Sequence, residues 1–235
     1  MRLRKIHADR EYTVAMRLFV ALDIPEPIRR EINTYVDDLR RVAPDTKWVR
    51  ADNYHITLKF IGEWKRDVCE VIEAVSKVEG PAIDVAIRGN GFFPTPRSPR
   101  VFWVGIESKP WGKNTLEGED GPSECGDGLP SPSGFESALQ VLAAQVDQAT
   151  STLGIEPESR PFSPHLTLAR SGSGSPRPRN DEKAVPSMKR LADRIAAMPA
   201  PDFGTIHATE FYLYESKLSS GGAKYTKLKS FGLRR

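Results

Sequence analysis

The sequence predicts an α+β protein of two similar lobes whose matching strands face one groove. Three observations predict this fold. The order strand, helix, strand, helix, strand occurs twice along the chain, and repetition of this kind indicates two related structural units. The middle strand of each half carries a His-x-Thr triplet followed by leucine, in "HITL" (55–58) and "HLTL" (165–168). The length of 235 residues suits one domain with two small lobes and a shared core.

The first half starts with a strand and an amphipathic helix. Residues 17–24 form a short apolar run that Pro25 ends, which is typical of a buried strand. Residues 25–42 carry apolar side chains at three- and four-residue steps and a proline in the first turn, as expected of a helix with one buried face. The other elements expected here are the first histidine strand within 47–62, entered by a turn at 51–53, a helix at 65–79 and a strand at 82–89.

The second half repeats this order and adds a hairpin. Its first helix pattern ends at Gly154, a residue type that favours helix ends. Its last strand is followed by "SSGG" and a returning strand, which together predict a β-hairpin. The expected elements are a strand at 100–106, a helix at 134–154, the second histidine strand at 160–170, a helix at 187–198, a strand at 205–216 and the returning strand at 224–231.

Three segments interrupt the regular pattern. Residues 1–15 are basic but lack the apolar core of a secretory signal. We therefore expect a flexible N-terminal extension ahead of a single folded domain at 16–235. Residues 107–133 and 171–186 are rich in Gly, Pro and Ser, which predicts two flexible surface insertions.

The composition indicates a cytoplasmic protein with a mildly basic surface. Apolar residues make up 39%, charged residues 28%, and the net charge is +3, which permits a polyanionic partner without requiring one. No apolar run approaches the ~20 residues that span a bilayer, so no membrane partner is expected. Cys69 and Cys125 stand far apart, without the spacing of a disulfide framework or a zinc cluster. We expect them to be free thiols in a reducing compartment.

The two triplets predict that each strand presents one imidazole and one hydroxyl on the same face. Side chains alternate between the faces of a strand, so His55 and Thr57 point one way, whereas Ile56 and Leu58 point into the core. His165 and Thr167 form the matching pair. A third triplet begins at His207, but it has no counterpart in the first half, and we interpret it as structural.

This set of side chains favours chemistry at phosphorus. One imidazole can take a proton from an attacking water while the other gives a proton to the departing oxygen, and an ordinary pKa of about 6.5 permits both roles near neutral pH. Threonine hydroxyls can donate to non-bridging phosphate oxygens. Two histidines without a third ligand do not make a convincing metal site, and no metal or P-loop motif occurs. We expect no metal, no cofactor, and a reactive substrate such as a 2′,3′-cyclic phosphate.

Five segments together resemble the RNA 2′,3′-cyclic phosphodiesterases, also called 2′-5′ RNA ligases, of the two-histidine phosphoesterase superfamily. The resemblance covers most of 16–235, whereas the extension at 1–15 and the insertion at 107–133 depart from the compact form of that family. The segments are "RLFVALDIP" (17–25), "HITLKFIG" (55–62), "GFFPTPRSPRVFWVGI" (91–106), "RPFSPHLTLAR" (160–170) and "EFYLYESKLSSGGAKYTKL" (210–228).

The resemblance implies both a fold and roles for individual residues. It implies two pseudo-symmetric lobes, with antiparallel sheets and outer helices, around a central cleft. It implies that His55 is the proton donor and His165 the proton acceptor in hydrolysis of a terminal cyclic phosphate to a 2′-phosphate. Thr57, Thr167 and Arg170 match phosphate-binding positions. By strand alternation Arg170 faces away from His165, so we expect its side chain to reach round the strand end.

Several functions stay open on the sequence alone. The same site could serve 2′-5′ RNA ligation, or it could hydrolyse small cyclic nucleotides instead of RNA ends that carry a 2′,3′-cyclic phosphate. A non-catalytic RNA-binding module is a further alternative, which the presence of two complete His-x-Thr triplets disfavours. We expect the protein to act as a monomer.

Overall fold

The computed structural model describes residues 15–109, 137–172, 186–219 and 222–234. The extension expected at 1–15 and the insertions expected at 107–133 and 171–186 lie outside these ranges, apart from a few residues at their ends. Residues 107 and 108 do not belong to an insertion, because they continue a strand.

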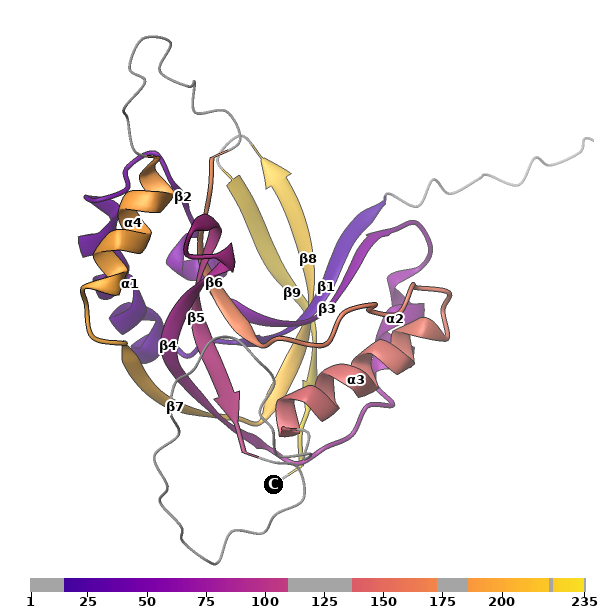
Figure 1. The fold of residues 1–235 in the computed structure, drawn as a ribbon. Helices are drawn as coiled ribbons and strands as arrows, with labels where there is room; N and C mark the ends of the chain where they lie inside the picture. The colour runs from indigo at the N-terminus through magenta and orange to yellow at the C-terminus, as the bar shows by residue number, and fades with distance from the viewer. Residues whose placement is uncertain (1–14, 110–136, 173–185, 220–221, 235) are drawn as a thin grey trace, which may run out of the picture.

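Nine strands of the described residues form two antiparallel sheets (Figure 1). The first sheet consists of β1 (Met16–Asp23), β3 (His55–Trp64), β8 (Glu210–Ser219) and β9 (Gly222–Gly232). The second consists of β2 (Lys47–Trp48), β4 (Ile83–Thr95), β5 (Ser98–Ser108), β6 (His165–Arg170) and β7 (Asp202–Ala208). The strand orders are β3-β1-β8-β9 and β2-β6-β5-β4-β7. The two histidine strands, β3 and β6, therefore lie in different sheets.

Each sheet combines strands from both halves of the chain. In the four-stranded sheet, β1 and β3 of the first half continue into β8, with Leu18 opposite Glu215. In the five-stranded sheet, β5 and β6 of the second half continue into β4 of the first. The predicted α+β fold with two matching lobes is confirmed, but neither lobe coincides with one half of the sequence.

Four α-helices of the described residues lie on the outside of the sheets (Figure 1). Helices α1 and α4 pack beside the five-stranded sheet, α3 packs beside β3 of the four-stranded sheet, and α2 packs against α3. Helix α3 begins with a capping box between Ser137 and Gln140, which satisfies two backbone N–H groups at its start. The bounds are α1 (Glu26–Arg40), α2 (Val68–Val75), α3 (Ala138–Ser151) and α4 (Ser187–Ala196), with a short 3-10 helix, η1 (Ala51–Asn53).

The prediction of one continuous strand at 205–216 is wrong. The structure divides it at Thr209 into β7, which pairs with β4, and β8, which pairs with β1. Ile206 and Ala208 are buried before the break, whereas Phe211 and Leu213 are buried after it. The inward positions thus change from even to odd numbers, so the apolar alternation shifts by one residue where the chain passes from one sheet to the other.

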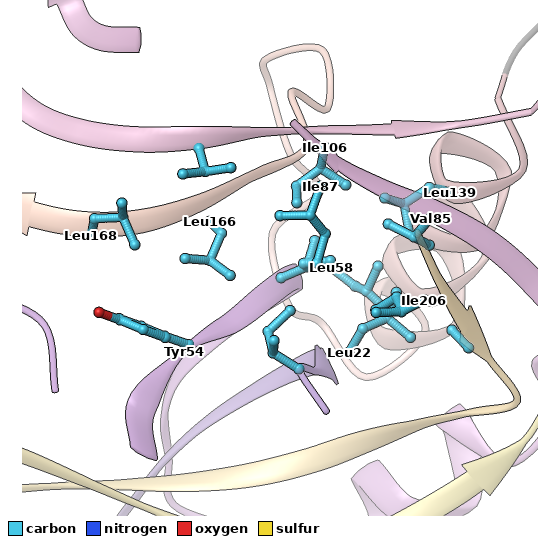
Figure 2. Close-up of a cluster of buried hydrophobic side chains, with 14 of the residues drawn as sticks. Leu22, Tyr54, Leu58, Val85, Ile87, Ile106, Leu139, Leu166, Leu168 and Ile206 are labelled. Atoms are coloured by element: carbon cyan, nitrogen blue, oxygen red, sulfur yellow. The ribbon is translucent and has the colours of Figure 1, made fainter. Parts of the chain in front are cut away.

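One hydrophobic core extends behind both histidine strands. It includes Ile56 and Leu58 of β3 together with Leu166 and Leu168 of β6, and the described residues of this cluster come from both sheets. Figure 2 shows Leu58, Leu166 and Leu168 in one cluster with side chains of neighbouring strands. Each fully buried leucine or isoleucine contributes roughly 1.5–3 kcal/mol. The core therefore fixes the two strands relative to one another from behind.

Among the charged residues that the structure describes, Lys59 is the one that is buried, with 2% of its surface exposed. Its Nζ atom lies 2.6 Å from Oδ1 of Asp147 on α3 and donates to the carbonyl oxygen of Glu156 over 2.8 Å. A buried ammonium needs such partners because burial removes its hydration. The contact joins the first histidine strand to α3 and to the segment that leads towards the second histidine strand.

We expect Asp147→Ala to lower the free energy of unfolding by about 3 kcal/mol, because it leaves the Lys59 ammonium buried with an incomplete set of partners. Urea denaturation measures this change. The matched control is Asp193→Ala, which removes the exposed partner of Lys189 on α4 and should cost at most about 0.5 kcal/mol. Equal losses in the two variants would contradict the assignment.

Candidate active site

The four side chains of the two triplets line one groove. Its volume is about 410 Å³, and His55, Thr57, His165 and Thr167 all border it. The residues between them in each strand are buried in the core behind the groove. The further groove residues used below are Arg17, Phe60, Arg170, Ala223 and Tyr225.

Each imidazole is held by the backbone carbonyl of the residue two positions before it. The distance from Nδ1 of His55 to the oxygen of Asn53 is 2.7 Å, and that from Nδ1 of His165 to the oxygen of Ser163 is 2.8 Å. A carbonyl oxygen only accepts, so Nδ1 carries the hydrogen in both rings. The Nε2 atoms are therefore available to a substrate, as acceptors when the ring is neutral and as donors when it is protonated.

Aromatic rings surround the two imidazoles. The centroid of His55 lies 4.9 Å from that of Phe19 and 5.2 Å from that of Tyr225, which meets it edge-on. The centroid of His165 lies 5.1 Å from that of Phe93, also edge-on. These rings restrict the rotation of both imidazoles and remove water from them.

Burial lowers the pKa of both histidines below the ordinary value of 6.5. The positive charge of Arg170 acts in the same direction on both, whereas the hydrogen bonds to Asn53 and Ser163 oppose the shift. Desolvation disfavours the charged form of an imidazole. In the free protein at pH 7, both rings are therefore mainly neutral.

Arg170 reaches the groove by a route that strand alternation does not predict. Phe102 of β5 pairs with Ala169 and Trp103 pairs with Thr167, so Leu168 is an extra residue in β6. Such a β-bulge reverses the alternation that follows it. Arg170 therefore lies on the face of Thr167, and the expectation that it reaches round the strand end is wrong.

Phe60 is a groove residue that the sequence reasoning missed. Strand β3 has the same bulge, because Ala21 pairs with Thr57 and Val20 pairs with Lys59. Phe60 consequently occupies in β3 the place of Arg170 in β6, and 46% of it is exposed. The signal was present in the sequence, since each residue stands five positions after its histidine. Arg17 lies over the Phe60 ring, 5.0 Å from the centroid.

His207 lies outside the groove. It belongs to β7, is exposed, and its Nδ1 is 2.7 Å from Oδ1 of Asp84 on the neighbouring β4. The other histidine, His7, lies outside the described residues.

Comparison with known families identifies the chain. The family model described as "LigT like Phosphoesterase" matches residues 22–103 and 129–225. The chain belongs to the LigT-like phosphoesterases. The resemblance inferred from the sequence is thereby confirmed.

Curated LigT-like relatives are similar over nearly the whole chain. A protein of Methanothermobacter thermautotrophicus named RNA 2′,3′-cyclic phosphodiesterase is 29% identical, over 93% of this chain and 99% of its own length. Proteins of the same name from Methanocaldococcus jannaschii and Escherichia coli are 28% and 26% identical, over 92% of this chain in both cases and over 100% and 96% of their own lengths.

Solved LigT-like structures share the fold. The Escherichia coli LigT complex with 3′-AMP matches with a TM-score of 0.62 and 26% identity, covering 94% of this chain and 99% of that one. A Thermus thermophilus structure titled TT0787 matches with a TM-score of 0.62 and 25% identity, over 93% and 98%.

The donor set of this LigT-like groove favours phosphate over a metal ion. Within the described ranges, no three His, Cys, Asp or Glu side chains come together as a metal ion would need. The groove instead offers two imidazoles, two hydroxyls and the guanidinium of Arg170, and such donors suit an anionic oxygen.

In the part of the chain that the structure describes, no helix has the length and apolarity that crossing a membrane requires.

Proposed function

We propose that this protein hydrolyses the 2′,3′-cyclic phosphate at RNA ends to a 2′-phosphate without a metal ion. The observation that carries this proposal is the groove itself, where two imidazoles with available Nε2 atoms lie with two threonines and Arg170. The names of the curated relatives support the substrate class. Because every one of these groups comes from a single chain, we also propose that the protein acts as a monomer.

In the proposed reaction the two histidines divide the proton transfers. His165 takes a proton from water as the water oxygen bonds to phosphorus, and His55 gives a proton to O3′ as the P–O3′ bond breaks. The phosphate stays on O2′, the imidazolium of His165 and the neutral His55 exchange a proton with solvent, and the site is restored. Thr57, Thr167 and Arg170 donate hydrogen bonds to the non-bridging oxygens, where negative charge gathers in the transition state.

The pH profile follows from the lowered pKa values. The proposed base must be neutral and the proposed acid protonated, so the acidic limb of kcat/KM reports His165 and the alkaline limb reports His55. Since burial holds both pKa values below 6.5 in the free protein, we expect kcat/KM to be highest on the acidic side of pH 6.5. The kcat profile should lie at higher pH, because the bound phosphate anion raises the pKa of both rings. A kcat/KM profile that rises steadily to pH 9 would contradict the assignment.

The test of the proposed function is one incubation with two readouts, the rate in EDTA and the position of the product phosphate. A short oligoribonucleotide that ends in a 2′,3′-cyclic phosphate is incubated with the protein in excess EDTA, and the position of the product phosphate is determined. We expect a 2′-phosphate at an undiminished rate. Loss of activity in EDTA with rescue by a divalent ion would overturn the metal-free mechanism, and a 3′-phosphate would overturn the proposed bond cleavage.

Two further substrates separate the remaining alternatives. A 2′,3′-cyclic mononucleotide tests small cyclic nucleotides, and an added 5′-hydroxyl oligonucleotide tests 2′-5′ ligation. The groove of about 410 Å³ is larger than a phosphate needs and suits a nucleotide. Because the curated relatives are named for RNA, we expect the oligonucleotide to have the higher kcat/KM. Binding of the oligonucleotide without turnover would indicate an RNA-binding module.

A further inference from the structure

The two carbonyls that hold the histidines are themselves held in different ways. Ser163 precedes Pro164, whose ring fixes its own φ and restricts the preceding residue to an extended backbone. Asn53 has no proline beside it. It is the last residue of the single turn η1, where its N–H donates to the Arg50 oxygen over 2.9 Å. One turn of 3-10 helix is weak support for a carbonyl that must aim an imidazole.

The Asn53 side chain supplies a second support from a distant part of the chain. Its Nδ2 donates to the carbonyl oxygen of Ala223 over 2.7 Å, although the two residues are 170 positions apart. Ala223 lies in β9, the edge strand of the four-stranded sheet. The same residue thus accepts from Nδ1 of His55 with its backbone and binds β9 with its amide.

Strand β9 also contacts the imidazole directly. Tyr225 follows Ala223 by two positions, borders the same groove, and meets the His55 ring edge-on with 5.2 Å between centroids. Asn53 therefore connects two of the groups that fix this ring, the carbonyl at Nδ1 and the strand that carries Tyr225. A smaller cavity of about 200 Å³ lies beside them and is also bordered by Asn53, His55 and Tyr225, so the ring has space to move if the connection is lost.

We propose that Asn53 is a positioning residue for His55, and that its amide bond to Ala223 keeps Nε2 of that ring aimed into the groove. The role rests on the proposed function only in taking His55 as a proton donor. An amide is required because the Ala223 carbonyl only accepts hydrogen bonds. Asn53→Asp would place a carboxylate oxygen against the carbonyl oxygen, so an isosteric side chain should fail.

The kinetic test is a pair of double-mutant cycles on the oligonucleotide with a 2′,3′-cyclic phosphate. We expect Asn53→Ala to lower kcat about 10-fold with little change in KM. In a His55→Ala background the same change should have almost no further effect, whereas in a His165→Ala background it should again cost about 10-fold, because residues that act as a unit are not additive. Equal losses in both backgrounds would overturn the proposal. Asn53→Asp provides the same cycles if the alanine variant is unstable.

A spectroscopic test does not depend on activity. The ¹⁵N shifts of the imidazoles report which ring nitrogen carries the hydrogen. In the unmodified protein we expect the Nδ1–H form for both histidines, and in Asn53→Ala a mixture for His55 with His165 unchanged. Absence of any change at His55 would overturn the positioning role, whereas a changed ring in a protein without turnover would overturn only the proposed function.

The matched control removes another long-range bond from a side chain to a backbone carbonyl. Arg66 donates to the carbonyl oxygen of Leu153 over 2.8 Å, on an exposed part of the surface and away from the groove. Arg66→Ala should leave kcat and both histidine spectra unchanged. A loss as large as that of Asn53→Ala would show that loosening the fold anywhere reduces turnover.

Discussion

Alanine at His55 or at His165 is expected to lower turnover of the cyclic phosphate by about 10²–10⁴-fold, the size typical of a lost general acid or base. The two losses should differ in kind. If His55 is the proton donor, its alanine variant should recover on a nitrophenyl phosphodiester, because that leaving group departs without a proton. His165→Ala should not recover, since the attacking water still needs a base.

The measurement is kcat/KM against pH for both variants on both substrates, with folding checked by circular dichroism. His165→Ala should lose the acidic limb of the profile, and His55→Ala the alkaline limb. The control is His207→Ala, which alters an exposed histidine outside the groove and should stay within a few-fold of the unmodified protein. Recovery of His165→Ala on the nitrophenyl substrate, and not of His55→Ala, would reverse the two roles.

Replacement of Arg170 should also lower kcat/KM strongly. Arg170→Met is expected to lower kcat/KM by about 10²-fold or more. This is the loss that typically follows removal of a hydrogen-bond donor to a developing oxyanion. Arg170→Lys should recover only part of this loss, because lysine keeps the charge but cannot form the paired hydrogen bonds of a guanidinium.

The pH profile provides an independent signature of Arg170. Its positive charge lowers the pKa of both histidines, so Arg170→Met should move both limbs of kcat/KM to higher pH. The matched control is Arg88→Met, which removes an exposed arginine of β4 that pairs with Glu107. An Arg170→Met variant with unmoved limbs and nearly full activity would show that this side chain does not contact the phosphate.

The main features of the site were predictable because they depend on local periodicity. A strand places residues i and i+2 on one face, so the triplets at 55–57 and 165–167 sufficed to predict which side chains share the groove. The amphipathic helices followed from the same reasoning at a period of 3.6 residues. Both patterns need only a few consecutive residues, so they are visible in the sequence before any tertiary contact is known.

Other features depend on interactions between distant residues and were missed or mispredicted. The bulges that turn Arg170 and Phe60 into the groove arise from the pairing register with β5 and β1, and the sequence shows of them only the shared spacing of five positions after each histidine. The chain passes from β7 to β8 at Thr209 with a shift of only one residue in the apolar alternation, and because both sides of the break alternate, 205–216 resembles a single strand. The link from Asn53 to Ala223 joins residues that have no recognisable relation in sequence.

The exchange of strands between the sheets has a consequence for biosynthesis. Leu18 pairs with Glu215, so β1 meets this neighbour only after about 200 further residues have been made, which at roughly 5–20 residues per second takes on the order of 10–40 seconds. During that interval the side of β1 that will pair with β8 is an open strand edge, and such edges invite pairing with other chains. The nascent chain should therefore depend on chaperones until its last hairpin emerges from the ribosome.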